Sequence, residues 1–585
     1  MKIGGFFTLL VFVPIIPMAQ ATGQDSIKTQ ELEEVVVEAV NQRTSSKSST
    51  YIPMAKQKNA SDDAISLLSQ MAIPQLNVDP ASQSVKTISG QPVSIFIDYV
   101  AASAQDLSGM RTSDVKRVEY LLYPSDLRFK GAQYVINFVM QKYEWGGYTK
   151  LNAEKWFGVN RSEASVYSKF AYKRMTFDLH VDEIYLTDRH TGIRSVETFQ
   201  FPDLFGNGPE IVERLSSPLS MLYRNNSNDV AFRALYSTEK VQMSNKLSFA
   251  YTSVPHNDTE NSLTYLDSFL PGSKAKTISS NHSWSLDYNS ETYASLSQKL
   301  GMNIEVRYRY DRNSSNSEYV DERLAIENDA REKSQYVSMT PCLVWNPNQH
   351  NSIMPYIHAE YSTAKIDYLG NSPSRQKYDI WGCMAGARYT YMQEKWSAGG
   401  LVGWVYANTN LTGTKIEDNY PQGNIFATYS PNDKNQIELT YAFGKQVPDT
   451  YQKSPNMLQQ DELTWYAGTP GLDNYWHHKV QATYTWLPSN KWQLALNGSY
   501  FISNNRVVPV YLPDGPGGTM LRKYVNNGDY NYGWIMASST AKFLSGNLIA
   551  KVSPYFDMYK TTGEYSMRQK GFFCIAQLTW YFGDF

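Results

Sequence analysis

The chain is poor in cysteine, in net charge and in long apolar runs. Only three cysteines occur among 585 residues, and their scattered positions form no redox or metal-binding spacing. The formal net charge is −2, so no excess of basic residues points to nucleic acid. Beyond the N-terminal leader, no apolar stretch approaches the roughly 18 residues that a membrane-spanning helix needs. These absences exclude a helical membrane protein and leave no reason to expect a nucleic-acid partner.

Motifs of common enzymes and cofactor sites are also missing. The sequence has no phosphate-binding glycine loop, zinc signature or nucleophilic serine elbow. His477 and His478 are adjacent, and neighbouring side chains of a strand point to opposite faces, so this pair does not chelate a metal. His180 and Asp182 share a face of one predicted strand, which favours a solvated pair over a catalytic one. We therefore predict no enzyme activity and no cofactor.

Aromatic residues, by contrast, are abundant. They make up 14% of the chain and include 43 tyrosines and 13 tryptophans. Transmembrane β-barrels need such residues for the aromatic girdles at both membrane interfaces. The mean hydropathy of −0.46 fits the same class, because each barrel strand is apolar only at alternate positions.

The first residues have the pattern of an export signal. Lys2 supplies the positive end, an apolar core follows at 6–18, and Ala19, Gln20 and Ala21 form a typical cleavage site. We predict a signal peptide at 1–21. The segment 22–60 is polar and has few core residues, so we predict that it is flexible and periplasmic.

One β-branched patch stands inside this polar segment. Val35, Val36 and Val37 follow an acidic stretch. Such a patch can add as an edge strand to the sheet of another protein. The alternative is a short strand that packs on the rest of the same chain.

Residues 61–145 combine helix and strand signals at short spacing. Apolar residues at i, i+3, i+4 and i+7 from Ala64 predict a helix. Strands are predicted at 93–99, at 117–122 and at 135–140. The last of these is apolar at nearly every residue, which is typical of a strand covered on both faces. We therefore predict a small α+β domain at 61–145.

From 146 to 585 the pattern is one of strands joined by turns. Apolar and polar residues alternate at 425–430, and short turns alternate with long polar loops at 187–217, 444–478 and 504–530. This asymmetry is typical of outer-membrane barrels, which have short periplasmic turns and long outer loops. At about 20 residues per strand with its share of loop, we predict about 22 strands, with about 20 as the nearest alternative.

Fragments of the α+β domain resemble, in their order, the plug domain of TonB-dependent outer-membrane receptors. The matching fragments are 62–68, 93–98, 106–107, 114–119, 124–125 and 135–142. The family's glycine after the second of them is Tyr99 here. The loop at 468–472 is similar to one in outer-membrane β-barrel receptors of Bacteroidota. The aromatic end of the chain at Phe585 resembles the signal that the barrel-assembly machinery reads.

The resemblance implies a mainly β fold, an antiparallel transmembrane β-barrel with the plug inside its lumen. It implies an integral protein of the Gram-negative cell outer membrane, in contact with its lipid. It also implies import of a ligand such as an iron chelate, an oligosaccharide or a peptide. The TonB energy-coupling complex would bind the residues Glu33, Glu34, Val35, Val36, Val37, Glu38 and Ala39. The alternative is a non-transporting binding or assembly barrel with a fixed plug.

Five residues are candidate ligand contacts. Asp106 lies at the predicted top of the plug, and Trp465, Tyr466, Tyr475 and Trp476 belong to one long loop. Aromatic rings beside polar groups can stack on a sugar or contact a peptide. The alternative is that these rings are girdle residues at the outer membrane interface.

Overall fold

The computed structural model describes residues 42–580, apart from short gaps. The gaps are at 45–47, 72, 74, 81, 88–91, 123, 125, 130–131, 159, 190–191, 267, 433, 490 and 545–547. The predicted signal peptide, the segment 33–39 and Phe585 lie outside the described residues, so these assignments stay predictions. No helix among the described residues is long and apolar enough to cross a membrane.

Residues 42–140 form a small α+β unit, here called the plug. Its main sheet has the strand order β1-β2-β7-β8-β5-β6. The predicted helix is confirmed as α2, whose buried apolar residues pack into the same core as β7 and β8. β8 is buried along almost its whole length, as its continuous apolar run predicts.

The plug elements are β1 (Gln42–Thr44), β2 (Ser48–Tyr51), α1 (Ala55–Asn59), α2 (Ala64–Met71), β3 (Leu76–Asp79), β4 (Ser84–Thr87), β5 (Ser94–Ile97), β6 (Val100–Ala101), α3 (Ala104–Gly109), η1 (Thr112–Asp114), β7 (Val115–Leu122), η2 (Leu127–Phe129) and β8 (Tyr134–Met140).

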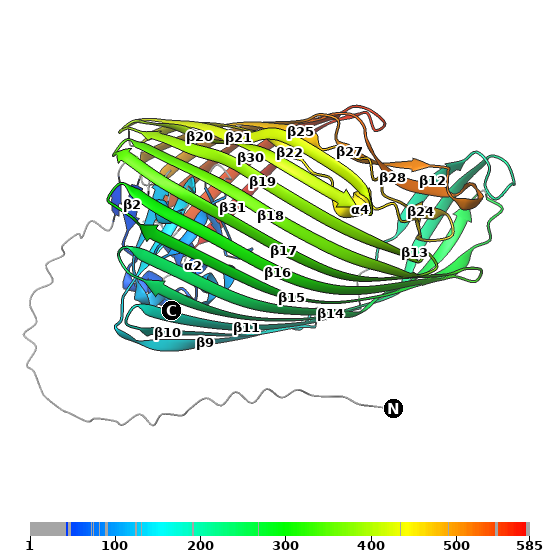
Figure 1. Cartoon of the computed structure of the whole chain (residues 1–585), viewed down its shortest axis with the longest axis horizontal. Helices are drawn as coiled ribbons and strands as arrows, with labels where there is room; N and C mark the ends of the chain where they lie inside the picture. The colour runs from blue at the N-terminus through cyan, green and yellow to red at the C-terminus, as the bar shows by residue number, and fades with distance from the viewer. Residues whose placement is uncertain are drawn as a thin grey trace, which may run out of the picture. The chain divides into compact units, whose positions relative to one another are not determined.

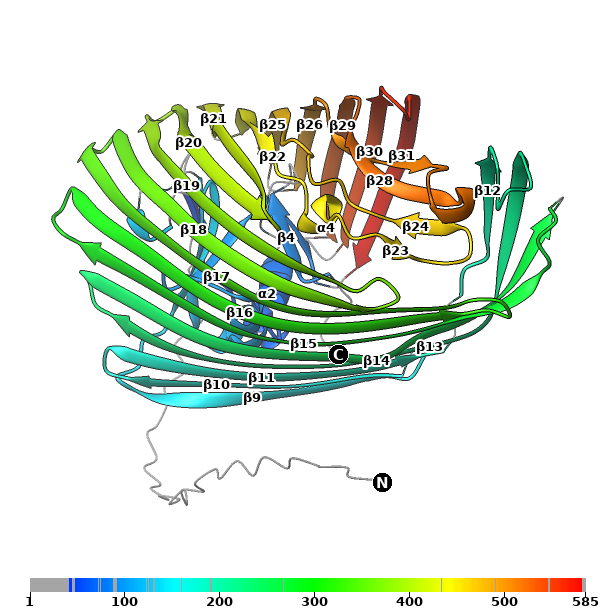
Figure 2. The same ribbon diagram turned by 45° about the vertical axis from the view of Figure 1, so that its right-hand side comes forward.

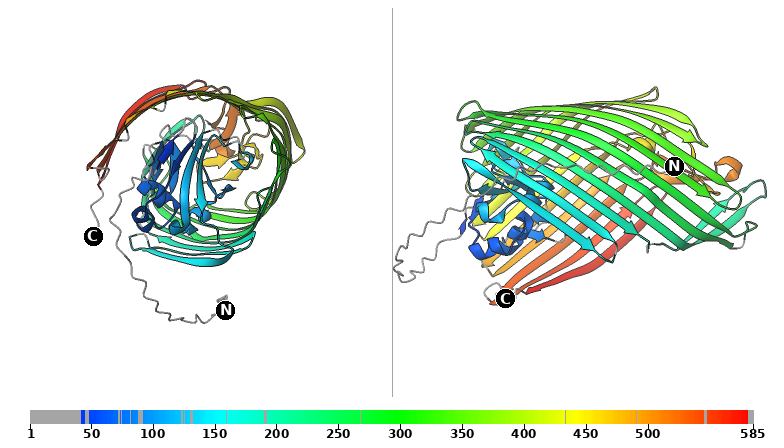
Figure 3. Two further views of the ribbon diagram at one scale, coloured as in Figure 1. Left: turned by 90° about the vertical axis from the view of Figure 1, so that its left-hand side faces the viewer. Right: turned by 90° about the horizontal axis from the view of Figure 1, so that it is seen from below.

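The rest of the described chain is dominated by one antiparallel sheet of 19 strands. This sheet curls into a barrel (Figure 1). The views along the barrel and from below show the plug, in blue, within the curve of this sheet (Figure 3). β9 and β31 are neighbours in the strand order. The register of the described residues pairs β9 with β10 and β31 with β30, and includes no pairing between β9 and β31.

The barrel strands are β9 (Trp145–Trp156), β10 (Arg161–Tyr172), β11 (Met175–Asp188), β12 (Ser195–Phe201), β13 (Glu210–Ser237), β14 (Val241–Leu266), β15 (Ser273–Ser295), β16 (Leu300–Val320), β17 (Ala325–Asn348), β18 (Asn351–Gly370), β19 (Ser374–Met392), β20 (Trp396–Leu411), β21 (Thr414–Asn432), β22 (Asn435–Gln446), β25 (Tyr475–Ser489), β26 (Trp492–Ser503), β29 (Tyr530–Phe543), β30 (Leu548–Thr561) and β31 (Met567–Trp580).

The two rims of the barrel differ in their connections. At the rim beside the plug, short turns such as 173–174 and 349–350 join the strands. At the opposite rim, the long connections 447–474 and 504–529 contain further elements. These are α4 (Thr450–Lys453), β23 (Leu458–Gln459), β24 (Thr464–Tyr466), β27 (Val507–Leu512), η3 (Pro516–Gly518) and β28 (Met520–Asn526). The long connections therefore all lie at one rim, as the sequence pattern predicts, but this rim also has connections as short as 412–413.

Sequence-based expectations differ from the structure at three points. The segment 22–60 was expected to be flexible, whereas its residues 48–51 and 55–59 form β2 and α1 of the plug. The predicted loop 187–217 is wrong in part, because it contains β12 and the start of β13; β12 pairs with the outer part of β13, and β11 with the inner part. The sheet has 19 strands where about 22 were expected. The estimate assumed short strands, whereas β13 alone has 28 residues, and the long connections form a sheet of their own.

Candidate functional site

An ion-pair cluster around Arg233 of β13 joins the plug to the barrel. Arg233 Nη1 donates to Asp106 Oδ2 of plug helix α3 over 2.8 Å. Its Nε and Nη2 donate to Asp178 Oδ2 of β11 over 2.9 and 2.6 Å. The Tyr167 hydroxyl donates to the other oxygen of Asp178, 2.9 Å away. One buried guanidinium therefore bridges plug and wall, and we call Asp106, Asp178, Tyr167 and Arg233 the plug latch.

Local structure holds Asp106 in place. Ser103 caps α3: its backbone N–H donates to Asp106 Oδ2 over 2.8 Å, and Asp106 N–H donates back to Ser103 Oγ over 3.3 Å. At the other end of the helix, a Cβ on Gly109 would lie 2.3 Å from the Tyr167 ring, so only glycine permits this approach. Burial alone would raise the pKa of Asp106, but Arg233 and the Ser103 hydrogen bonds hold that pKa below its ordinary value.

Further plug contacts with the barrel wall are also polar. Lys150 Nζ of β9 donates to the carbonyl oxygens of Asp62 and Ser108, over 2.5 and 2.6 Å. Lys551 Nζ of β30 donates to Asn77 Oδ1 over 2.7 Å. In contrast, the main apolar core of the plug consists of plug residues alone, from Tyr51 to Met140. The plug is thus a self-contained unit held in the barrel by polar side chains.

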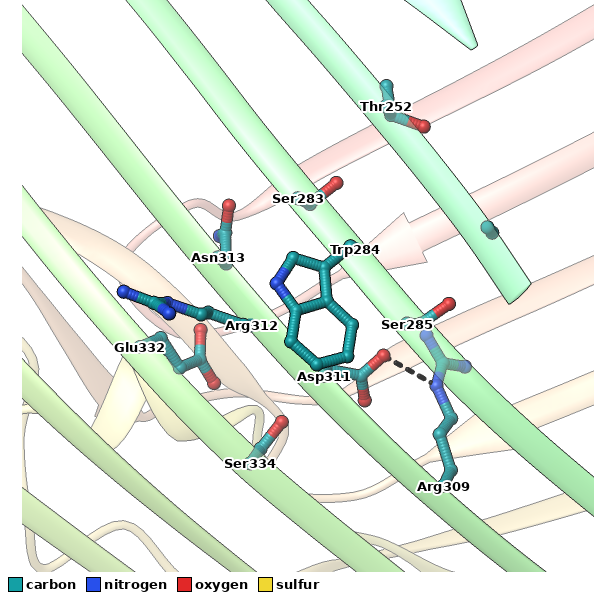
Figure 4. Close-up of a pocket in the computed structure, with 11 residues that line it drawn as sticks. Thr252, Ser283, Trp284, Ser285, Arg309, Asp311, Arg312, Asn313, Glu332 and Ser334 are labelled. Atoms are coloured by element: carbon teal, nitrogen blue, oxygen red, sulfur yellow. Dashed lines mark hydrogen bonds and ion pairs between the residues drawn. The ribbon is translucent and has the colours of Figure 1, made fainter. Parts of the chain in front are cut away.

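A cavity of about 430 Å³ lies against the sheet beyond the latch (Figure 4). Its side chains are mainly hydroxyl, amide and charged groups of β14 to β17. Arg309 Nε donates to Asp311 Oδ1 within it, over 2.8 Å. Its polar lining includes Thr252, Ser283, Ser285, Arg309, Asp311, Asn313, Glu332 and Ser334.

The two long connections form a second obstruction at the far rim, which we call the outer cap (447–474 and 504–529). Their strands make a four-stranded sheet in the order β23-β24-β28-β27, and β24 runs parallel to β28. Figure 2 shows this sheet at the end of the barrel away from the plug. Leu463 and Met520 of the cap share an apolar core with the barrel wall, including Leu263 and Tyr319.

Charged groups complete the attachment of the cap. Arg214 of β13 donates from Nη1 to Glu462 Oε1 over 3.0 Å, and it also pairs with Glu197 and Asp461. The Tyr319 hydroxyl donates to Glu462 Oε2 over 2.5 Å, and Tyr265 donates to the other oxygen. Burial would raise the pKa of Glu462, but Arg214 and the two tyrosines lower it.

The structure separates the five predicted ligand contacts. Asp106 belongs to the plug latch. Trp465 and Tyr466 lie on β24 of the cap, where the Tyr466 hydroxyl donates to the Tyr451 carbonyl oxygen over 2.7 Å. Tyr475 and Trp476 begin β25 of the barrel sheet. Their ligand-binding role stays a prediction.

The Trp476 ring also contacts a charged group of the barrel. The ammonium nitrogen of Lys445 lies 5.5 Å from its centroid, and the Lys445 side chain pairs with Asp418 over 2.8 Å. This arrangement fixes the ring against the wall by a cation–π contact.

Comparison with known proteins agrees with this architecture. Residues 357–583, from β18 to the end of the sheet, match the Outer membrane protein beta-barrel family. The protein is an integral β-barrel of the outer membrane. No curated protein matches its sequence.

Solved structures share the fold of this outer-membrane barrel over most of its length. The structure named Copper transporter OprC has 10% sequence identity and a TM-score of 0.54, covering 93% of this chain and 84% of that chain. A chain of the FpvAI–pyocin S2 complex has 9% identity and a TM-score of 0.51, covering 91% of this chain and 72% of that chain. At these identities the likeness concerns the fold alone.

Sequence reasoning selected Asp106 but missed the arginines that fasten the plug and the cap. Arg233 meets Asp106 across 127 positions, and Arg214 meets Glu462 across 248. Each is a single charge in an alternating strand, a pattern that a solvated residue of a barrel lumen shares. The signal in the sequence that could have found them is an arginine at an inward-facing position of a predicted strand.

Proposed function

We propose that this protein is an outer-membrane importer whose plug is displaced by the TonB energy-coupling complex. The observation that carries the proposal is the construction of the plug. Its apolar core is complete without the barrel, and polar contacts hold it to the wall. Water can replace polar contacts when the plug moves, whereas a shared apolar core would resist separation.

On this proposal, the inward path of a ligand has two obstructions. A ligand would pass the outer cap, enter the space beside the polar cavity and then reach the plug. An iron chelate, an oligosaccharide and a peptide all remain candidate ligands. The copper transporter OprC has this fold, which supports a transport role without naming the cargo.

The proposal is tested by binding of the periplasmic domain of TonB from the same organism to the purified full chain in detergent. We expect binding that disappears when residues 33–39 are deleted, because Val35, Val36 and Val37 would add as a strand to the TonB sheet. The matched control deletes the seven residues 23–29 from the same segment and should bind normally.

A barrel with a fixed plug is the second candidate, and the plug latch favours it. The buried pair of Arg233 with Asp106 and Asp178 fixes the orientation of α3 on the wall. If the folded wild-type barrel, recognised by its heat-modifiable migration, fails to bind TonB, the importer is wrong and the fixed-plug barrel is favoured.

A further inference from the structure

The wall beyond the plug latch is organised in rungs. Directly paired residues of antiparallel strands lie on the same face, so the register defines which side chains are neighbours. The latch rung contains Asp178, Arg233 and Lys246. Four residues further from the plug, one continuous rung consists of Asp182, Asp229, Ala250, Ser285, Asp311 and Ser334. The next consists of Ile184, Ser227, Thr252, Ser283, Asn313 and Glu332.

These rungs lie on the inner face of the sheet. Lys246 and Gln242 of β14 face the plug, since Gln242 Nε2 donates to the Asp98 carbonyl oxygen and Lys246 shares the latch rung. Residues of β14 with the same parity, including Ala250 and Thr252, therefore also face inward. Leu247, Phe249 and Tyr251 of the other parity are exposed on the outer face.

Three carboxylates of these rungs are left without a counter-charge. Asp182 and Asp229 are directly paired, which places two like charges about 5 Å apart at Cβ, a destabilising arrangement. Within the described part of the chain, neither carboxylate makes a hydrogen bond or an ion pair, and the titratable group that acts on both is the His180 imidazole. Glu332 also makes neither, while Arg312 lines the same cavity. Asp311 differs, because Arg309 neutralises it.

A buried imidazole, which can accept or donate a hydrogen bond, adjoins the aspartate pair. His180 lies on the same strand and face as Asp182, at the next position toward the plug. It is 7% exposed, and its Nδ1 has no hydrogen-bond partner. The cavity, the unpaired carboxylates and this imidazole thus form one continuous surface above the latch.

The spacing of the charges indicates the shape of a ligand. Asp229 on β13 and Glu332 on β17 are four strand spacings apart, about 19 Å along a flat sheet. Hydroxyl groups of Thr252, Ser283 and Ser285 lie between them and can accept hydrogen bonds from N–H groups. Carboxylates spread over this distance match separate charges on an extended molecule better than a single metal ion.

We propose that this wall binds a linear organic polycation. One ammonium group would meet Asp182 and Asp229, a second would meet Glu332, and the chain between them would cross the cavity. The claim that a polycation is the imported cargo rests on the proposed function. The claim that the wall binds a polycation is measured without transport.

The test uses spermine as the probe and isothermal titration calorimetry of the purified full chain in detergent. The double variant Asp182→Asn/Asp229→Asn keeps the side-chain shape and removes both charges. We expect at least tenfold weaker spermine binding for this variant and a smaller loss for Glu332→Gln. Asp557→Asn, a charge removal far along the sheet on β30, is the matched control and should bind within about twofold of wild type.

Three results would overturn the proposal. They are the absence of spermine binding to the folded wild type, an equal loss in Asp557→Asn, and displacement of spermine by an equal concentration of Ca²⁺. The outcome is separable from that of the importer, because deletion of 33–39 should leave spermine affinity unchanged. Spermine binding without TonB binding would retain this site and reject the importer.

Discussion

The plug and the outer cap obstruct the same barrel but are attached in different ways. The plug has an apolar core of its own and contacts the wall through Arg233, Lys150 and Lys551. The cap places Leu463 and Met520 into a core that it shares with the wall. Separation of the plug would expose mainly polar surface, whereas separation of the cap would expose apolar side chains to water.

Magnitudes sharpen this contrast. Full burial of a leucine or methionine side chain contributes roughly 1.5–3 kcal/mol. A buried ion pair contributes little net stability when both partners become hydrated together, but removal of one partner costs about 3–5 kcal/mol. The latch therefore specifies how the plug sits without preventing its release as a unit. The cap, in contrast, is held by the burial of apolar side chains, and any opening of the cap must overcome that free energy.

The largest expected effect comes from a charge placed in the shared core. Leu463 is fully buried, and Leu463→Asp would leave an unpaired carboxylate in apolar surroundings at a cost of several kcal/mol, roughly 3 or more. We expect the cap to detach while the barrel stays folded. Limited proteolysis should then cleave 447–474 and 504–529 at least tenfold faster, with heat-modifiable migration retained.

The matched control for this variant is Val447→Asp, because Val447 lies in the same connection and is 41% exposed. Its cleavage rate should equal that of the wild type. Unchanged proteolysis of Leu463→Asp would mean that the cap does not depend on the shared core, and the contrast with the plug would fail.

The second prediction concerns the latch. Arg233→Met leaves Asp106 and Asp178 buried without their guanidinium, which should destabilise the seated plug by about 3–5 kcal/mol. Hydrogen–deuterium exchange of α3 should increase, while exchange in the cap stays constant. Arg331→Met is the control, because its exposed pair with Asp329 spans 3.7 Å and contributes about 0–1 kcal/mol.

A triple variant separates the effect of the uncompensated carboxylates from the effect of the lost Arg233 contacts. Asp106→Asn and Asp178→Asn, added to Arg233→Met, remove the uncompensated carboxylates and should restore much of the protection of α3. Exchange that stays as fast as in Arg233→Met alone would show that the charges are not what seats the plug.

Acid should weaken the plug latch by a smaller amount. The folded pKa of Asp106 lies below its ordinary value of 3.8 because Arg233 and Ser103 outweigh the effect of burial. The ionised carboxylate therefore stabilises the plug above that pH, and this stabilisation is lost as the pH falls through the lowered pKa. Protection of α3 should exceed that of Asp106→Asn at pH 7 and should converge with it only as the pH falls below the ordinary pKa of 3.8, through the lowered pKa of Asp106. A difference that grows in acid would contradict this sign.

Local patterns predicted the plug and the alternating strands well. The spacing from Ala64 indicates α2, and the apolar run of β8 indicates a doubly covered strand. Tyr99 stands where the resembling family has glycine, yet it still forms the expected turn. Its φ is +69°, its N–H donates to Asn137 Oδ1, and the Arg128 guanidinium carbon lies 3.4 Å from its ring centroid. Side-chain contacts there support a conformation that glycine would adopt more readily.

The site was less predictable because it depends on register. A one-residue slip moves every side chain of a strand to the other face, so the sequence does not show that Asp182 faces Asp229 or that Arg233 reaches Asp106. The cap was difficult to predict for a similar reason, because it depends on pairing between distant segments. β24 and β28 are parallel neighbours from two connections separated by the barrel strands β25 and β26, and no local motif links them.

The smallest predicted effect isolates one hydrogen bond in the cap. Tyr319→Phe removes the hydroxyl that donates to Glu462 Oε2 and keeps the ring in the shared core. Loss of a hydrogen bond to a charged group costs about 1.5–3 kcal/mol, but Arg214 and Tyr265 still bind Glu462, so we expect the lower end of this range. Cleavage of the cap should accelerate only a few fold, far less than in Leu463→Asp. If Tyr319→Phe opened the cap as fully as Leu463→Asp, the polar cluster rather than the apolar core would hold it, and plug and cap would be fastened alike.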